Sequence, residues 1–192
     1  MNPWYNSGVL RCTILLAAAL LTSCGASAPA APNFTLLDDG ARSWTLAAQH
    51  KAVLLTFGFT HCADTCPATL ALLSRLSHAL GRRESGVEIA FVTVDPARDT
   101  PRALHAFVAR FAPLTQSRIV GLTGSRAQIA AVESAYHVWS APTHRRAETS
   151  HAYDVAHSAQ IFFITREGRL SSIHDDDDSS ATLARALREI VG

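Results

Sequence analysis

Cysteine is scarce in this chain, and its placement limits what the folded part can use it for. Only four cysteines occur in 192 residues: Cys12, Cys24, Cys62 and Cys66. The first two fall in an N-terminal leader, so Cys62 and Cys66 are the only pair left for the folded domain. A separate structural disulfide within one chain is thereby excluded, and the fold must depend on its hydrophobic core.

Charge is sparse as well. Charged residues make up 17% of the chain, Lys51 is the single lysine, and the formal net charge is +1. A balance this close to neutrality argues against a general nucleic-acid-binding or anionic-membrane surface. Hydrophobic residues make up 48%, which is enough for a sizeable core in one domain and makes disorder unexpected.

The N-terminal leader has the pattern of an export signal. An apolar run over residues 13–21 follows Arg11 and is shorter than the roughly 20 residues that a transmembrane helix needs. It ends in Leu-Thr-Ser-Cys at residues 21–24, which resembles the lipobox of bacterial lipoprotein signals and implies cleavage before Cys24 and lipidation of that cysteine. Ordinary cleavage within residues 26–28 and retention of the leader as an anchor are the alternatives.

We therefore predict three segments along the chain. Residues 1–23 form a lipoprotein-type signal peptide, residues 24–32 a flexible tether rich in Ala, Pro and Ser, and residues 33–192 the folded domain. The domain is expected outside the cytoplasm, on the periplasmic face, lipid-anchored to a cell-envelope membrane. Thiols tend to oxidise in that compartment.

Residues 57–67, Phe-Gly-Phe-Thr-His-Cys-Ala-Asp-Thr-Cys-Pro, are expected to carry the chemistry. They follow an apolar run at 52–57 and precede helical apolar spacing at 68–80, so a buried strand should lead through a loop into a helix. Pro67 suits the first helical position, which would place Cys66 at the helix cap. The N–H groups of a helix start favour negative charge, so these thiols are expected to deprotonate easily. Cys62 and Cys66 can then close into a disulfide or bind one soft metal ion.

The remaining pattern predicts an α/β domain with a thioredoxin-like fold. A hairpin with its turn at Asp39-Gly40 comes first, and an irregular polar insertion covers residues 137–152, before His157. Strands are expected at residues 52–57, 87–94, 119–122, 159–164 and 169–173, and helices at 68–80, 100–111, 125–136 and 180–191. Functional loops in such sheets lie beyond the carboxyl ends of the strands, where Cys62 and Cys66 fall.

Three segments together resemble the Sco/SenC family of cytochrome oxidase assembly proteins. Residues 57–67 are similar to that family's copper-site motif. Residues 92–101, Val-Thr-Val-Asp-Pro-Ala-Arg-Asp-Thr-Pro, are similar to its second motif, and residues 154–168 to its third. The segments lie in family order, and the resemblance spans most of the domain.

The resemblance implies the metal ligands. The family's two motif cysteines and its distant histidine correspond to Cys62, Cys66 and His157, which would bind copper as Cu(I) or Cu(II). Ala63 and Thr65 depart from the family pattern without removing a donor atom. Soft thiolates select Cu(I), and an imidazole nitrogen would complete a three-coordinate site that leaves an open edge for transfer.

The first functional hypothesis is an extracytoplasmic copper chaperone that helps assemble the binuclear copper centre of cytochrome c oxidase subunit II. The resemblance implies this partner; other periplasmic copper chaperones or thiol reductants are possible further partners, and nucleic acid is not expected. The second is a membrane-tethered thiol–disulfide oxidoreductase or thiol peroxidase that uses the Cys62/Cys66 pair. The third is copper sensing or buffering without transfer.

Structural alternatives remain open for each candidate residue. Cys62 and Cys66 could form a plain stabilising disulfide, and His157 could be a partly buried histidine at a strand start. Asp95 and Arg98, on the loop after the second buried strand, either pair and fix that loop near the copper edge or simply form a turn, and the structural role is favoured. Three histidines recur every seven residues in the insertion, and His174 precedes four aspartates; both groups are interpreted as solvated polar segments rather than second metal sites.

Overall fold

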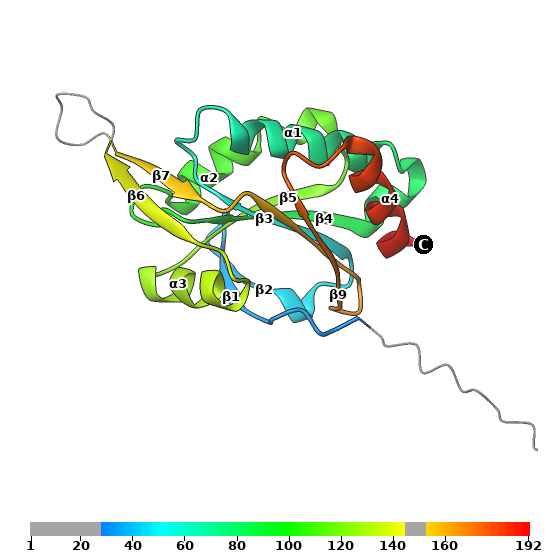
Figure 1. Cartoon of the computed structure of the whole chain (residues 1–192), viewed down its shortest axis with the longest axis horizontal. Helices are drawn as coiled ribbons and strands as arrows, with labels where there is room; N and C mark the ends of the chain where they lie inside the picture. Colours follow the sequence, from blue (N-terminus) through cyan, green and yellow to red (C-terminus); the bar gives the residue numbers. More distant parts are fainter. Residues whose placement is uncertain (1–27, 145–152) are drawn as a thin grey trace, which may run out of the picture.

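The computed structural model describes residues 28–144 and 153–192, and the domain is built on one central sheet (Figure 1). The strand order in this sheet is β2-β1-β5-β4-β3-β8-β9. Strands β3, β4 and β5 run parallel, whereas β1, β8 and β9 pair antiparallel with their neighbours. The strands are β1 (Thr35–Asp38), β2 (Ser43–Thr45), β3 (Ala52–Gly58), β4 (Val87–Thr93), β5 (Arg118–Thr123), β8 (Gln160–Ile164) and β9 (Leu170–Asp175).

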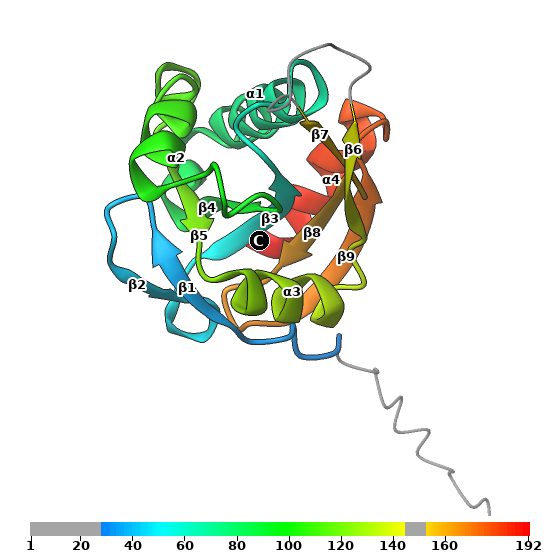
Figure 2. The same ribbon diagram turned by 90° about the vertical axis from the view of Figure 1, so that its left-hand side faces the viewer.

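Helices cover both faces of the sheet. Figure 1 shows α1, α2 and α4 on one face and α3 on the other, and Figure 2 shows the same layers from the side. The hydroxyls of Thr100, Ser125 and Ser179 cap three of these helices by accepting hydrogen bonds from backbone N–H groups in the first turn. The helices are α1 (Thr65–His78), α2 (Pro101–Val108), α3 (Arg126–Ala135) and α4 (Ser180–Val191), with short 3-10 turns at Leu46–Ala48, Gly81–Gly86 and Ala112–Leu114. The predicted α/β, thioredoxin-like fold is confirmed.

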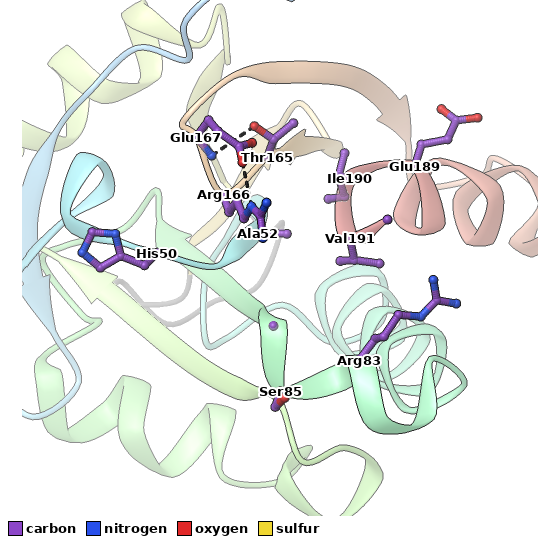
Figure 3. A pocket seen from close by; sticks show the side chains of 12 residues that line it. His50, Ala52, Arg83, Ser85, Thr165, Arg166, Glu167, Glu189, Ile190 and Val191 are labelled. Atoms are coloured by element: carbon purple, nitrogen blue, oxygen red, sulfur yellow. Dashed lines mark hydrogen bonds and ion pairs between the residues drawn. The ribbon is translucent and has the colours of Figure 1, made fainter.

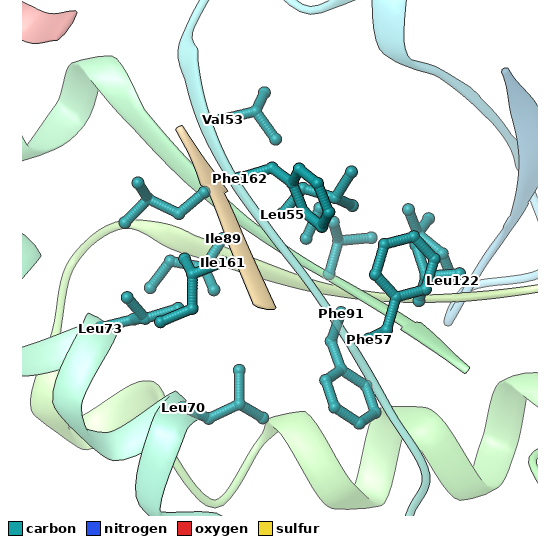
Figure 4. Packing of buried hydrophobic residues seen from close by; sticks show 14 of the residues in the cluster. Val53, Leu55, Phe57, Leu70, Leu73, Ile89, Phe91, Leu122, Ile161 and Phe162 are labelled. Carbon is teal, nitrogen blue, oxygen red and sulfur yellow. The ribbon is translucent and has the colours of Figure 1, made fainter. Parts of the chain in front are cut away.

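The hydrophobic core lies on both sides of the central strands. Every residue of β3 and β4 is buried, because helices cover both faces of a largely parallel sheet. Leu70 and Leu73 of α1 are fully buried and point toward the sheet (Figure 4). On the opposite face, the rings of Phe57 and Phe162 meet edge to face at 6.0 Å between centroids, and Tyr136 packs against both. This packing holds β3 rigidly, and β3 ends at the candidate site.

A second, two-stranded sheet corrects the prediction of an irregular stretch over residues 137–152. Strands β6 (Ser140–His144) and β7 (Tyr153–His157) pair antiparallel, with Ser140 opposite His157. The hairpin contains polar residues and Pro142 and is not buried along a whole face, so its sequence lacks the alternating apolar pattern that predicts strands. The hairpin projects beyond the central sheet (Figure 1). Residues 145–152, and with them His151, lie outside the described residues.

The N-terminal segment of the described chain is docked rather than free. Residues 28–32 were predicted as the end of a flexible tether, yet Ala31 donates to Gly168 O at 2.9 Å and Leu170 donates to Pro29 O at 2.8 Å. This segment therefore packs on the turn between β8 and β9. The predicted signal peptide and Cys24 lie outside the described residues. Within the described ranges, no helix has the length and apolar character needed to cross a bilayer.

Candidate metal centre

The loop that follows β3 places Cys62 and Cys66 next to each other. The Cys62 N–H donates to Phe59 O at 3.2 Å, and the Cys66 N–H donates to Cys62 Sγ at 3.3 Å. Helix α1 begins at Thr65, two residues before Pro67, so the predicted start at Pro67 with Cys66 as the cap is wrong. The first-turn N–H groups of a helix have no intrahelical partner, and proline is therefore tolerated within that turn as well as at its first position.

Burial changes the expected acidity of Cys66. Its side chain is 3% exposed and packs against Gly58, where a Cβ atom would lie 2.6 Å from Cys66 Sγ. Burial raises the pKa of the Cys66 thiol, and the hydrogen bond with Cys62 raises it further. The prediction of easy deprotonation is thus wrong for Cys66 in the metal-free protein. The Cys66 N–H donates instead to the sulfur of Cys62, which is only partly buried.

His157, at the end of β7, points toward the same sulfur. Its Nε2 atom lies 3.7 Å from Cys66 Sγ, and its Nδ1 atom lies 3.0 Å from Ser158 O. A carbonyl oxygen only accepts, so Nδ1 is the donor and carries the proton of the neutral ring. Nε2 is then the atom with a lone pair, and it faces Cys66. The edge of the ring also meets Phe59, with centroids 5.9 Å apart.

A surface hollow of about 480 Å³ adjoins these residues. Cys62 and His157 line it, together with the carboxylates Asp64, Asp154 and Asp176. Across residues 28–144 and 153–192, no three His, Cys, Asp or Glu side chains are already arranged to hold a metal ion. A metal held by both cysteines and His157 would therefore need these side chains to move toward one another.

The loop between β4 and α2 is hydrogen-bonded to the segment that leads into Cys62. Both alternatives considered for Asp95 and Arg98 occur together: the carboxylate forms an ion pair with Arg98 Nε, and the Arg98 N–H donates to Asp95 O in a turn. Asp99 accepts hydrogen bonds from the Thr60 N–H at 3.0 Å and from the Thr60 hydroxyl at 2.6 Å. Thr60 precedes Cys62 by two residues, so this carboxylate fixes the start of the cysteine loop.

Sequence reasoning missed Tyr153. Its hydroxyl donates to Asp95 Oδ1 at 2.7 Å, and its ring lies under the guanidinium of Arg98 at 3.7 Å. Tyr153 stands four residues before His157, and residues at that spacing share one face of a strand. The spacing would have singled it out had β7 been recognised as a strand.

Several polar residues noted in the sequence are not brought to the sulfurs. His61 is exposed and contacts Thr60, and His137 is exposed at the end of α3. His174, in β9, contacts Asp178 of the following turn at 2.7 Å. A second hollow, of about 450 Å³, lies at the opposite end of β3 around Ala52 and contains none of the predicted site residues (Figure 3).

Comparison with known proteins gives a consistent result. The family model described as SCO1/SenC matches residues 25–192. The chain is 32% identical over 173 residues to "Protein SCO1 homolog 1, mitochondrial" of Arabidopsis thaliana, which covers 87% of this chain and 49% of the relative. It is 35% identical over 160 residues to "Protein SCO2 homolog, mitochondrial" of Bos taurus, covering 81% and 58%. The chain thus spans about half the length of the curated relatives it matches.

Solved structures share the same fold. The structure described as Bradyrhizobium japonicum ScoI with copper bound superposes with a TM-score of 0.72 and 30% sequence identity. The match covers 84% of this chain and 99% of that one, so the described domain corresponds to the whole of that structure.

Proposed function

Because this chain belongs to the SCO1/SenC family, we propose that it is a copper-binding metallochaperone in which Cys62, Cys66 and His157 hold the copper cargo. Relatives of this fold have been solved with copper bound, which supports copper as the cargo here. Two thiolates and one imidazole form a soft donor set that suits Cu(I) and tolerates Cu(II).

One observation supports this proposal most directly. His157 Nε2 lies 3.7 Å from Cys66 Sγ, although 91 positions separate the two residues in the chain. The Nδ1 proton is already used in the contact with Ser158 O, so the free lone pair is aimed at the sulfur. A ligating histidine is commonly oriented in this way by a hydrogen bond from its other ring nitrogen.

The location and the recipient extend the same proposal. The lipobox-like residues 21–24 support lipidation at Cys24, with the domain on the periplasmic face of a cell-envelope membrane. The recipient is the binuclear copper centre of cytochrome c oxidase subunit II. Cys62 is only partly buried and borders the open hollow, so ligands of a recipient can approach the bound ion from that side.

The test is an anaerobic Cu(I) titration of the reduced protein against a competing chelator, with X-ray absorption at the copper edge. One copper per chain with sulfur and nitrogen neighbours is expected, and Cys62→Ser/Cys66→Ser should abolish tight binding. Loss of a group that only hydrogen-bonds to a metal ligand costs about 10- to 100-fold in metal affinity, so His157→Ala, which removes a ligand itself, should weaken binding by at least about that factor. His61→Ala is the matched control, because His61 adjoins Cys62 yet is exposed and should leave the affinity unchanged. Equal affinities for the wild type and the double cysteine variant would exclude the proposal.

A thiol–disulfide oxidoreductase is the second candidate, and one observation favours it. Both cysteines are free thiols, and Cys62 is the more accessible and accepts a hydrogen bond from the Cys66 N–H, an arrangement that suits an attacking sulfur. His157→Ala separates the two functions. A chaperone should lose tight copper binding, whereas a dithiol reductase should still reduce substrate disulfides at the wild-type rate.

A further inference from the structure

The strand that carries His157 is not held by the main sheet. Among the described strands, β7 pairs only with β6, and these two form a sheet separate from the seven-stranded one. The ladder of the main sheet resumes at Gln160 of β8, three residues after His157, so it constrains but does not by itself fix the distance between His157 and the cysteine loop. That distance depends also on side-chain contacts between β7 and the rest of the domain.

The strongest of these contacts join β7 to the loop 95–99. Arg98 Nη1 donates to Tyr153 O at 3.0 Å, and the guanidinium lies over the Tyr153 ring at 3.7 Å. The Tyr153 hydroxyl donates to Asp95, which is itself paired with Arg98. Burial and the neighbouring Asp95 carboxylate raise the pKa of the Tyr153 phenol, so it remains a donor. Charge-assisted hydrogen bonds such as these are roughly twice as strong as neutral ones.

The same loop holds the cysteine side of the site. Asp99 binds both the N–H and the hydroxyl of Thr60, and it is held in turn by the hydroxyl of Thr93 at 2.6 Å. One short loop is therefore bonded on one side to the segment that leads into Cys62 and on the other side to the strand that ends at His157.

The contacts continue without a break to the imidazole. Arg98 lies 5.8 Å from the centre of the Phe59 ring, and the Phe59 ring meets the edge of His157 at 5.9 Å. A rotation or shift of Arg98 would therefore displace the Phe59 ring, which packs against His157.

Arg98 has an energetically unfavourable feature, a buried nitrogen left unpaired among the described residues, which a purely stabilising role does not explain. Its Nη2 atom is buried and has no hydrogen-bond partner within the part of the chain that the structure describes. Leaving such a donor unsatisfied is unfavourable. The arrangement is understandable if the planar guanidinium is needed to hold Asp95, Tyr153 and Phe59 in one geometry.

We propose that Tyr153 and Arg98 are positioning residues for the metal site, and that loop 95–99 sets the separation of His157 from Cys66. The proposal rests on the proposed function, since it gives a role to these residues in copper binding. It also makes a prediction about the metal-free protein, which can be tested independently.

The first experiment measures Cu(I) affinity in Tyr153→Phe and Arg98→Met, each alone and combined with His157→Ala. Arg98→Met should weaken binding by about 10- to 100-fold, as expected for a residue that orients a metal ligand without binding the metal. Tyr153→Phe keeps the ring and loses one hydrogen bond, so a loss of roughly threefold to tenfold is expected. In the His157→Ala background both effects should vanish, because the residues act through that imidazole.

Tyr136→Phe is the matched control. It also removes one tyrosine hydroxyl, which donates to Pro32 O at 2.8 Å on the other face of the sheet. Its copper affinity should equal that of the wild type. Effects of Tyr153→Phe or Arg98→Met that persist in full in the His157→Ala background would overturn the proposal, since they would reflect a general structural role.

The second experiment uses NMR of the metal-free, reduced protein. Nuclear Overhauser contacts between the rings of His157 and Phe59 should be present in the wild type and in Tyr136→Phe, weakened in Tyr153→Phe and lost in Arg98→Met. Unchanged contacts in Tyr153→Phe and Arg98→Met would overturn the positioning role. If the wild type binds no copper, the proposed function fails, while this comparison still decides whether loop 95–99 positions the histidine. Should Arg98→Met fail to fold, Tyr153→Phe alone decides both experiments.

Discussion

Gly58 is the point where β3 meets the buried sulfur, and Gly58→Ala is the sharpest test of this packing. The added Cβ atom would lie 2.6 Å from Cys66 Sγ and 2.6 Å from Phe91 Cε2. Carbon atoms in favourable contact are about 3.5–4.0 Å apart, so both neighbours would have to withdraw by roughly 1 Å. Neither can do so freely, because Cys66 is 3% and Phe91 1% exposed.

The magnitude follows from this overlap. Overpacking of a well-packed core costs about 1–3 kcal/mol, and each kcal/mol lowers Tm by about 2–4 °C in a domain of this size. We therefore expect Gly58→Ala to lower the Tm of the reduced, metal-free protein by about 2 to 12 °C. A displaced Cys66 sulfur would also leave its 3.7 Å contact with His157, so Cu(I) affinity should fall in the same variant.

Gly86→Ala provides the matched control. Gly86 is the last residue of the 3-10 turn Gly81–Gly86 and does not have a positive φ. A Cβ atom added there would have no neighbouring atom within 4 Å. The same chemical change there should leave stability unchanged or raise it by about 0.4–1 kcal/mol. Thermal unfolding of both variants under reducing conditions gives the comparison. Equal Tm values for Gly58→Ala and Gly86→Ala would refute the close packing of Cys66 on β3.

Three further predictions concern the support of the domain. Burial by itself raises the pKa of Glu84, but hydrogen bonds from Thr115 and two backbone N–H groups hold that pKa below its ordinary value. Such a carboxyl stabilises the fold above about pH 4.3 and loses its contribution as pH falls through the lowered value, so Glu84→Gln should reduce the urea midpoint more at about pH 7 than at about pH 3. Asp99→Ala removes the acceptor of the Thr60 N–H and should cost about 1–3 kcal/mol in urea unfolding. Ser125→Ala removes the capping box of α3 and should cost about 1 kcal/mol by the same measurement.

Each of these predictions has a clear contrary outcome. An equal loss at both pH values for Glu84→Gln would mean that its carboxylate is not preferentially ionised in the folded state. Wild-type stability in Asp99→Ala would contradict the role of Asp99 in holding the cysteine loop. For Ser125→Ala the control is Ser134→Ala in the same helix, which is exposed and away from the cap. The capping argument fails if the two serine variants are equally stable.

Elements with local signals were predictable from the sequence. The strands β3 and β4 are mostly apolar because they are buried on both faces, and Thr100 and Ser125 mark the starts of their helices through side chains that cap the first turn. The Asp39-Gly40 turn between β1 and β2 was equally predictable from the sequence.

Features that depend on tertiary contacts were not predictable in this way. The hairpin of β6 and β7 is largely polar, so periodicity missed it. The high pKa of Cys66 arises from burial against Gly58, which no local pattern reveals, whereas the helix-start argument considered only neighbouring N–H groups. The approach of His157 to Cys66 came only from the family resemblance, and the contact of Tyr153 with Asp95 and Arg98 was not foreseen at all.

The docking of residues 28–32 on the turn after β8 limits how far the domain can move from a membrane to which Cys24 is attached. Ile164 lies beside Val53 at the start of β3, so this turn is at the end of the sheet opposite to the cysteines. With a lipid on Cys24, four peptide steps separate the anchor from Ala28, about 14 Å at full extension.

Such a short connection would keep that end of the domain near the bilayer, and with β3 upright its length would place the sulfurs about 20 Å further out. Trp139, which is 60% exposed and bonded to Ser158 beside His157, should then escape quenching by lipid-bound quenchers in vesicles. Strong quenching would place the site at the surface instead. A recipient would consequently have to present its own metal site well above the membrane plane, at the height where the donor holds its sulfurs.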